Sequence, residues 1–309
     1  MAKLLVERYP EVHVTYWEPR LALTTKLGRF GGQLCFKQGD VVVNPANFDV
    51  VWNRAGYVAA MNDLNGSFPG VDQPLLRQSH ITACLYRELQ AGDDKLWLNP
   101  PVPRAEADRR IAVNKFGPMA GFVTPRTLMS NHPEAIARFL EQCEGGIVAK
   151  SFGLARFGGP MQETRRFKPE HLAFKDALGL TPVVYQQLVA AKKQLRVVVF
   201  GRNVFAGLSE LPSDLLDIRK LWLLNSKSIV RYDLSDDLKA KCLALKNHLR
   251  LNVVVLDVGL TEAGEAVLFD VNPTGLFSLL QEMDPTIPAT DAFLDFIASA
   301  DANFEYGVL

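Results

Sequence analysis

Residues 253–258 read Val-Val-Val-Leu-Asp-Val, and residues 266–273 read Ala-Val-Leu-Phe-Asp-Val-Asn-Pro. Both runs are rich in β-branched and apolar residues, which predicts two buried strands joined by a turn. Side chains alternate between the two faces of a strand, so Asp270 and Asn272 point the same way, and Asp257 can face them from the neighbouring strand. The pattern therefore predicts a hairpin that carries two carboxylates and an amide oxygen on one surface.

These three side chains form a candidate metal site. Mg²⁺ prefers hard oxygen ligands, takes few of them from the protein, and completes its shell with water and phosphate oxygens. Asp257, Asp270 and Asn272 are accordingly the candidate metal ligands. The alternative interpretation is a hairpin whose polar residues sit on a solvated face.

The composition limits the class of protein. The chain has 309 residues, 48% of them hydrophobic, and its 34 Lys and Arg balance its 34 Asp and Glu. This length allows two domains or three subdomains, and the charge balance predicts neither a nucleic-acid nor a membrane partner. The four cysteines are scattered without metal-binding spacing, which favours reduced thiols in the cytoplasm. No apolar run approaches the roughly 20 residues of a membrane span.

Hydrophobic periodicity predicts the elements around the hairpin. Further strands are expected at 12–17, 41–43, 49–54, 147–150, 183–189, 195–200 and 203–208, and helices at the N-terminus and at 75–91, 133–142 and 235–249. Asn131 is the predicted N-cap of the helix at 133–142, with Glu134 three residues later as in a capping box. Residues 93–110, rich in Pro and charge, are predicted to be a linker.

A glycine-rich stretch, 151–160, follows the strand that ends at Lys150. It contains Gly153, Gly158 and Gly159. Glycines let backbone N–H groups approach phosphates, and a lysine adds a point charge. The stretch lacks the Gly-Lys-Ser/Thr of a P-loop. A flexible hairpin with no phosphate-binding role would have the same glycine-rich composition.

Several short motifs occur along the chain in the order that they have in the ATP-grasp superfamily. The chain therefore resembles this superfamily, closest to the microviridin-type graspetide synthetases and the ribosomal-protein glutamyl ligases. The resemblance spans about residues 50–285. The residues that carry it are Val51-Trp52-Asn53-Arg54, Asn114-Lys115-Phe116, Phe122 to Leu128, Val148-Ala149-Lys150 with the glycine-rich stretch, Tyr185 to Val189, Leu195 to Gly201, Asp217-Ile218-Arg219, and finally Asp257, Asp270 and Asn272.

The resemblance implies an α/β (α+β) fold in three parts. An N-terminal pre-ATP-grasp-like domain over 1–110, expected to lack its first strand, precedes a central subdomain over 111–185 and a C-terminal subdomain over 186–309. The two later parts are antiparallel-sheet subdomains that clasp the nucleotide.

The resemblance also implies roles for individual residues. ATP would be held by Lys115, Lys150, the three glycines and the segment Gln187-Leu188-Val189 with Gln194, and Mg²⁺ by the candidate metal ligands. Arg196 and Arg219 would be the catalytic cations that stabilise charge developing on oxygens.

Four positions depart from the family's pattern. Asp270 and Gln187 stand where relatives carry Glu, and Gln194 replaces an Asp that touches the ribose. Leu221 stands where the glutamyl ligases carry Asn, which favours the peptide-maturing side. The residues Trp222 to Leu224 are interpreted as core or hairpin packing, with an apolar groove for a leader peptide as the alternative.

The implied reaction is an ATP-dependent carboxylate–amine or carboxylate–hydroxyl ligation through an acyl phosphate. The expected substrate is a ribosomally made precursor peptide that gains side-chain ester or amide links. Two alternatives stay open, a ligase that adds a free amino acid to a protein or small-molecule carboxylate and a degenerate scaffold that binds nucleotide without catalysis. Whether the protein forms a homodimer is also open.

Overall fold

The structure, a computed structural model, describes residues 1–16, 26–30, 33–52, 84–85, 87–89, 95–150, 164–212, 216, 218–224 and 228–299. The chain divides into two compact units. One lies within Met1–Ala105 and takes in the end of the last helix from Phe293, and the other is Glu106–Ala292. The predicted domain boundaries at 110 and 185 remain predictions.

The first unit is built from short strands and short helices. It contains α1 (Ala2–Arg8), an antiparallel sheet in the order β1 (Lys26–Phe30), β2 (Gln33–Gln38), β3 (Val41–Val43), and a parallel pair of β4 (Val50–Trp52) and β5 (Leu96–Leu98). Its core gathers Phe36, Val43, Leu85, Leu89 and Trp97. The predicted N-terminal helix and the strands at 41–43 and 49–54 are thus present.

Two predictions for this part of the chain are wrong. Residues 12–16 form no strand, because their side chains are mostly exposed and no described strand pairs with them. The predicted linker at 93–110 instead holds β5 and α3 (Pro101–Ala107). Proline is tolerated at the first helical position, where its missing N–H would have had no partner, so Pro101 starts a helix there. The predicted helix at 75–91 falls largely outside the described residues, of which 84–85 and 87–89 are helical.

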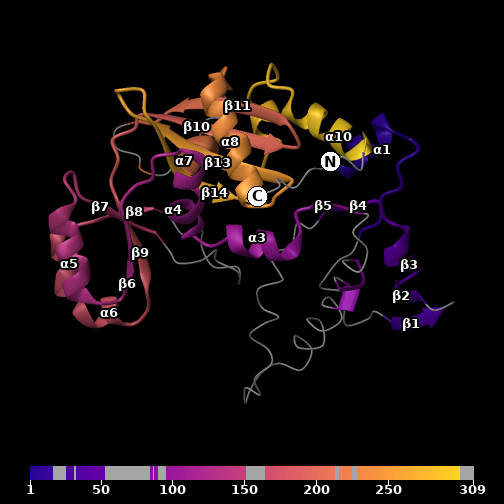
Figure 1. Cartoon of the computed structure of the whole chain (residues 1–309), viewed down its shortest axis with the longest axis horizontal. Coiled ribbons are helices and arrows are strands. Elements are labelled where there is room, and N and C mark those ends of the chain that lie inside the picture. The colour runs from indigo at the N-terminus through magenta and orange to yellow at the C-terminus, as the bar shows by residue number, and fades with distance from the viewer. Residues whose placement is uncertain are drawn as a thin grey trace, which may run out of the picture. The chain divides into compact units, whose positions relative to one another are not determined.

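The second unit contains a four-stranded antiparallel sheet and the helices beside it. The strand order is β6 (Thr127–Ser130), β9 (Val183–Gln187), β7 (Ile147–Lys150), β8 (Arg165–Phe167). Figure 1 shows α5 (Pro133–Gln142) and α6 (Lys175–Gly179) beside this sheet. Ile136, Ile147 and Tyr185, all at most 1% exposed, form the centre of its core.

The start of α5 differs from the prediction in one detail. The helix begins at Pro133, as expected, but its N-cap is His132, and no side chain caps it. Asn131 instead donates its amide to the carbonyl of Gly179 at 2.9 Å. Glu134 Oε2 lies 3.0 Å from His132 Nδ1, so this carboxylate contacts the histidine ring and the predicted capping box does not form.

A five-stranded antiparallel sheet completes the second unit. Its order is β12 (Val230–Arg231), β11 (Asn203–Glu210), β10 (Lys193–Phe200), β13 (Val253–Leu260), β14 (Ala266–Asn272). The helices α4 (Ala112–Phe116) and α8 (Asp236–His248) pack against it, and α7 (Ile218–Leu224), α9 (Leu279–Met283) and α10 (Ala289–Ser299) complete the described helices. The two antiparallel sheets that the sequence resemblance implies are therefore confirmed.

Helix α8 and the β13–β14 hairpin form as the sequence predicts. Ser235 caps α8 by accepting a hydrogen bond from the backbone N–H of Leu238. Cys242 and Leu245, which belong to the helix, are fully buried. Gly264 has φ +79° in the hairpin turn, a conformation that favours glycine. None of the described helices combines the length and the apolar character of a membrane span.

The cysteines provide a check on this packing. Burial raises the pKa of the Cys242 thiol to about 12, and it also raises the pKa of Cys143 above its usual value. Only the thiolate reacts, so we expect iodoacetamide to label the exposed Cys84 quickly and Cys242 only after unfolding. Peptide mass spectrometry after timed labelling measures both rates. Equal rates at Cys84 and Cys242 in the native protein would contradict the packing of α8.

Candidate functional site

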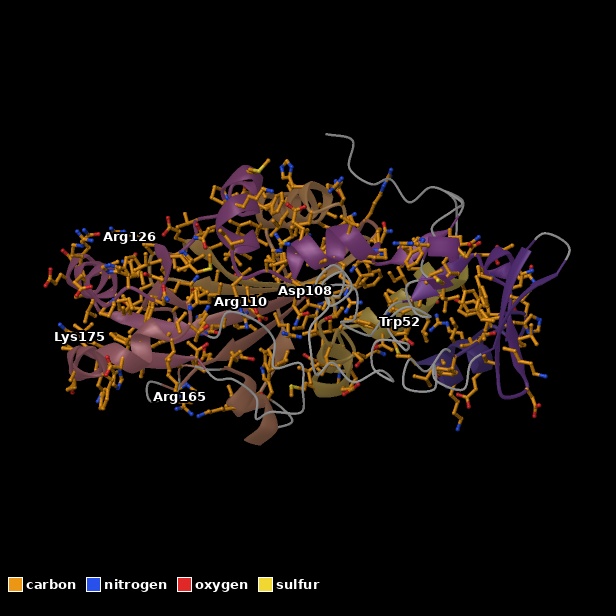
Figure 2. All side chains as sticks on the ribbon, turned by 90° about the horizontal axis from the view of Figure 1, so that it is seen from below. Trp52, Asp108, Arg110, Arg126, Arg165 and Lys175 are labelled. Atoms are coloured by element: carbon orange, nitrogen blue, oxygen red, sulfur yellow. The ribbon has the colours of Figure 1, made fainter. Side chains whose placement is uncertain are left out.

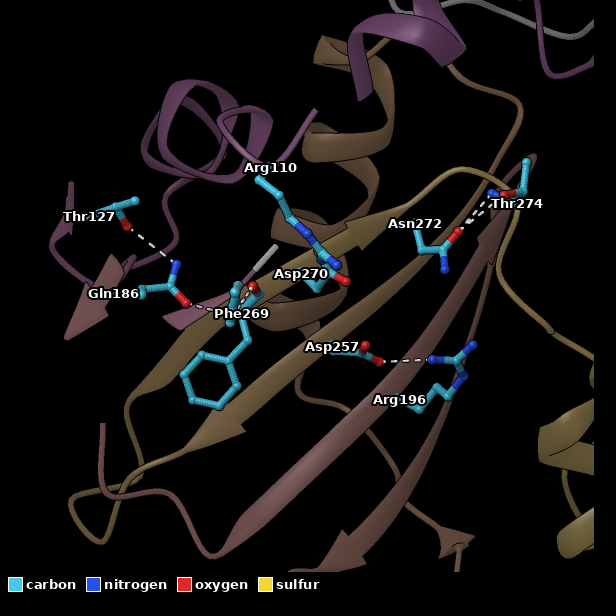
Figure 3. Close-up of polar contacts among 10 residues, drawn as sticks. Arg110, Thr127, Gln186, Arg196, Asp257, Phe269, Asp270, Asn272 and Thr274 are labelled. Atoms are coloured by element: carbon cyan, nitrogen blue, oxygen red, sulfur yellow. Dashed lines mark hydrogen bonds and ion pairs between the residues drawn. The ribbon is translucent and has the colours of Figure 1, made fainter. Parts of the chain in front are cut away.

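The hairpin register brings the two predicted metal carboxylates together. Asp257 in β13 and Asp270 in β14 are directly opposite each other, and a register irregularity follows Asp257. Figure 3 shows both side chains on neighbouring strands. This carboxylate pair, Asp257 and Asp270, is the centre of the candidate site.

An arginine contacts each member of the carboxylate pair. Arg196 Nη1 donates to Asp257 Oδ1 at 3.0 Å, and Arg110 Nη1 donates to Asp270 Oδ1 at 2.7 Å. Arg196 was predicted as a catalytic cation, and the structure places it in β10 directly opposite Asp257. Arg110 was not predicted. It reaches Asp270 across 160 positions of sequence, and no local motif indicates such a contact.

The electrostatics of the pair favour an added cation. Burial raises the pKa of the Asp257 carboxyl, and the nearby charge of Asp270 adds to that rise, whereas Arg196 and Lys150 oppose it. The pKa of Asp257 remains above its ordinary value, so Arg196 and Lys150 leave a cost for holding this carboxylate charged beside Asp270. A small divalent cation at the pair would lower that cost.

The third predicted ligand, Asn272, is next to the pair but is already engaged. Its Oδ1 accepts hydrogen bonds from the backbone N–H and the hydroxyl of Thr274 at 3.0 and 3.3 Å. A cation would have to share this oxygen, or the amide would turn. Among the described residues no group of three or more His, Cys, Asp or Glu side chains could hold a metal. Two carboxylates and an amide nevertheless fit Mg²⁺, which fills its shell with water and phosphate oxygens.

Arg196 is held firmly in place. It is 7% exposed, its Nη2 donates to the carbonyl of Leu276 at 3.3 Å, and its guanidinium lies 4.8 Å from the ring centroid of Trp222 in α7. The chain passes close by because residue 275 is glycine, where a Cβ would stand 2.6 Å from Val255 Cβ. Trp222 was predicted to be core or hairpin packing, whereas it lies in a helix and contacts the candidate catalytic arginine.

Lys150 links the two sheets. Its Nζ donates to Gln186 Oε1 at 2.6 Å in β9 and to the carbonyl of Phe269 at 3.4 Å in β14. Gln186 is 4% exposed and donates in turn to the hydroxyl of Thr127 at 3.2 Å. The ammonium therefore has a fixed position next to β14, the strand that carries Asp270. Figure 3 shows its two acceptor residues, Gln186 and Phe269. Gln186 belongs to the motif that carries the resemblance, but the sequence assigned it no role of its own.

Replacing Gln186 by Leu should therefore displace Lys150. The variant loses the acceptor that fixes the ammonium, and we expect nucleotide affinity to fall by about tenfold, with unfolding stability lowered by about 1–3 kcal/mol. Equilibrium dialysis with labelled ATP and thermal unfolding measure the two effects. Thr127→Val is the matched control, because it removes the far end of the chain of hydrogen bonds and leaves the Lys150–Gln186 bond intact. Equal affinities in both variants would contradict the role of Gln186.

Lys115, which was predicted to bind ATP, makes no hydrogen bond or ion pair with the carboxylate pair or with Lys150 among the described residues. Its Nζ lies 2.6 Å from Glu106 Oε1 and 4.6 Å from the ring centroid of Phe116, and its side chain is 57% exposed. Hydrogen bonding from this lysine lowers the pKa of Glu106. Its predicted role with ATP stays a prediction.

The remaining nucleotide-binding predictions concern the segment after β9. Gln187 donates its backbone N–H to the carbonyl of Arg126 at 2.8 Å, and Leu188 donates to the carbonyl of Gly146 at 3.0 Å. Gln187 is therefore the last residue of β9, an inner strand of the four-stranded sheet, and Leu188 and Val189 follow it. Gln194 lies in β10, two residues before Arg196. Their contacts with adenine and ribose remain predictions.

Some of the predicted site residues lie outside the described residues. These are Gly153, Gly158, Gly159, Asp217 and the side chain of Arg219, although the backbone of Arg219 is part of α7. The lid and the Asp-x-Arg motif are therefore predictions from sequence.

Comparison with known proteins identifies the fold. No family model and no curated protein matches the sequence. Among solved structures, the macrocyclase MdnC bound to its precursor peptide MdnA, from Microcystis aeruginosa MRC, is 20% identical, with 96% of this chain and 95% of that chain covered and a TM-score of 0.76. A RiPP-associated ATP-grasp ligase from Chryseobacterium gregarium, in complex with ADP and a leader and core peptide, is 20% identical over 92% of this chain and 87% of its own, with a TM-score of 0.74.

A third solved structure is similar over nearly its whole length. The ATP-grasp ligase PsnB, in complex with a phosphomimetic variant of its minimal precursor, Mg and ADP, is 18% identical over 97% of this chain and 93% of its own, with a TM-score of 0.70. The chain thus has the fold of the ATP-grasp ligases, as the resemblance in its sequence implied.

Proposed function

We propose that this protein is an ATP- and Mg²⁺-dependent ligase that forms ester or amide links between side chains of a ribosomally made precursor peptide. The observation that carries the proposal is the group of charges in the second unit. The carboxylate pair, Arg196 and Lys150 come from four strands of two sheets and gather at one place in an ATP-grasp fold. Residues that only stabilised the sheets would not need such a concentration of partly buried charge.

The similar solved structures support the substrate class. MdnC is bound to a precursor peptide, the Chryseobacterium ligase to ADP with leader and core peptides, and PsnB to Mg, ADP and a precursor variant. Leu221, in α7, stands where the glutamyl ligases carry Asn, which also favours a peptide substrate. The four free cysteines fit a reducing compartment such as the cytoplasm.

The residues divide the work as follows. Lys150, fixed by Gln186, holds the phosphates of ATP, and Arg196 stabilises negative charge on the oxygens when a peptide carboxylate attacks the terminal phosphate. A peptide hydroxyl or amine then displaces phosphate from the acyl phosphate. Asp257, Asp270 and Asn272 would hold Mg²⁺, which when bound neutralises charge on the phosphates.

The test is a reaction with a peptide from the protein's own genomic neighbourhood. The protein is incubated with Mg²⁺-ATP and synthetic peptides encoded by short acidic reading frames beside its gene. We expect ADP formation that depends on one of these peptides and a mass loss of one water for each new link. A mass gain equal to an amino acid less one water would instead support the amino-acid ligase. The absence of ADP with every peptide and every amino acid would support the non-catalytic scaffold.

A further inference from the structure

Arg110 contacts the carboxylate pair from outside the sheet. It lies between α3 and α4, and its Nη1 is 2.7 Å from Asp270 Oδ1, with the two side chains 20% and 27% exposed. Figure 3 shows the guanidinium next to the Asp270 carboxylate. A short contact between two ionised groups is among the stronger hydrogen bonds in proteins. Arg110 therefore neutralises the carboxylate that the proposed function gives to Mg²⁺.

A divalent cation and Arg110 need the same oxygen. Mg²⁺ binds its oxygen ligands at about 2.0–2.1 Å. Arg110 Nη1 already stands 2.7 Å from Asp270 Oδ1, so a cation on that oxygen would bring two positive centres close together. Like charges at such short range repel strongly in a partly buried site. Binding of the cation therefore requires Arg110 to release Asp270 or to shift along it.

Arg110 is the arginine that is able to leave. Arg196 is 7% exposed, bonds the carbonyl of Leu276 and packs on Trp222, so its position is fixed from three sides. Arg110 is more exposed, and within the described part of the chain its side chain makes no second hydrogen bond. Among the described residues, moving it away from Asp270 breaks one hydrogen bond.

We propose that Arg110 competes with the divalent cation for Asp270. It neutralises the carboxylate pair before the cation binds, and it lowers the cation affinity of the nucleotide-free protein. The released guanidinium then needs an anion, and nucleotide phosphates beside the pair supply one. Cation and nucleotide therefore raise each other's affinity, as linkage requires. This inference rests on the proposed function, because it takes Asp270 to be a cation ligand.

Mn²⁺ is a suitable probe, because paramagnetic resonance of the free ion measures its binding directly. The full-length protein is titrated with Mn²⁺ alone and again with ADP, and wild type is compared with Arg110→Gln and Arg109→Gln. Arg109 is the exposed neighbour of Arg110 and is the matched control for the loss of one positive charge. Without nucleotide, we expect Arg110→Gln to bind Mn²⁺ about tenfold more tightly than wild type and Arg109→Gln to bind it as wild type does.

The outcomes separate the inference from the proposed function. The role of Arg110 is overturned if, without nucleotide, Arg110→Gln binds Mn²⁺ no more tightly than Arg109→Gln. Failure of both variants to bind Mn²⁺ detectably would overturn it as well. If wild type and both variants also take up no Mn²⁺ beyond that held by ADP itself, the proposed function fails as well. Thermal unfolding reports whether Arg110→Gln folds. If it does not, Arg110→Lys takes its place, because a lysine keeps the charge but loses the fork geometry, and a smaller gain in Mn²⁺ affinity is then required.

Discussion

Replacing Asp270 by Asn is expected to lower Mg²⁺-dependent ADP formation by about a hundredfold or more. The change keeps the size of the side chain and removes one of the two carboxylate charges that would hold the cation. Without the second charge, Asp257 alone binds Mg²⁺ weakly, and the phosphates lose their neutralising partner. Coupled-enzyme measurement of ADP over a range of Mg²⁺ concentrations tests the effect, and part of the activity should return at high Mg²⁺.

The fold of this variant should survive. Arg110, the partner that Asp270→Asn leaves behind, is 20% exposed and can turn toward water. Asp257→Asn is a less clean variant, because it leaves the buried Arg196 without its carboxylate, a loss that costs about 3–5 kcal/mol in such pairs. Asp233→Asn is the matched control, since that carboxylate is 83% exposed and pairs only with Arg231 among the described residues. Equal activities of the Asp270 and Asp233 variants would contradict the metal assignment.

Replacing Lys150 by Met is expected to abolish most of the activity and to weaken nucleotide binding. Met fills similar space and removes the ammonium that stands between Gln186 and the carbonyl of Phe269. Losing one preorganised charged donor costs about a hundredfold in rate in comparable sites. Dialysis with labelled ATP and single-turnover ADP formation measure the binding and the rate separately.

Lys175→Met is the control for this change. Lys175 is exposed in α6, and Figure 2 shows it well apart from Arg110, which marks the site. We expect this control to bind ATP as wild type does. Unchanged nucleotide affinity in Lys150→Met would mean that the strand before the glycine-rich stretch does not hold phosphates.

The sheet that carries the site could be predicted from sequence for a physical reason. Its strands are long runs of β-branched residues, with Val197, Val198 and Val199 fully buried, and such runs have few alternative structures. The alternation of side chains along the hairpin then placed Asp257 and Asp270 on neighbouring strands of one surface. The direct pairing of the two carboxylates needs more than the turn, because the register set by the turn pairs Val258 with Leu268, and the irregularity after Asp257 then brings Asp270 opposite it.

Other features depend on contacts that no local pattern reports. Arg110 meets Asp270, and Trp222 meets Arg196, only because distant segments pack together. Pro101 was taken as part of a linker, although proline is tolerated at the start of a helix and the neighbouring Trp97 is buried. Residues 12–16 have strand-like composition but no partner strand among the described residues, and a strand without a partner is not stable.

The most direct test of the proposed Mg²⁺-ATP site is the melting temperature of the protein with Mg²⁺-ATP, compared with its melting temperature with the same ATP in EDTA. A ligand at about 100 times its dissociation constant adds roughly 2.7 kcal/mol to the free energy of unfolding, which a melting curve resolves. We expect a rise that requires Mg²⁺ and is lost in Asp270→Asn. No shift at millimolar Mg²⁺-ATP would contradict it, because the carboxylate pair and Lys150 would then hold no nucleotide.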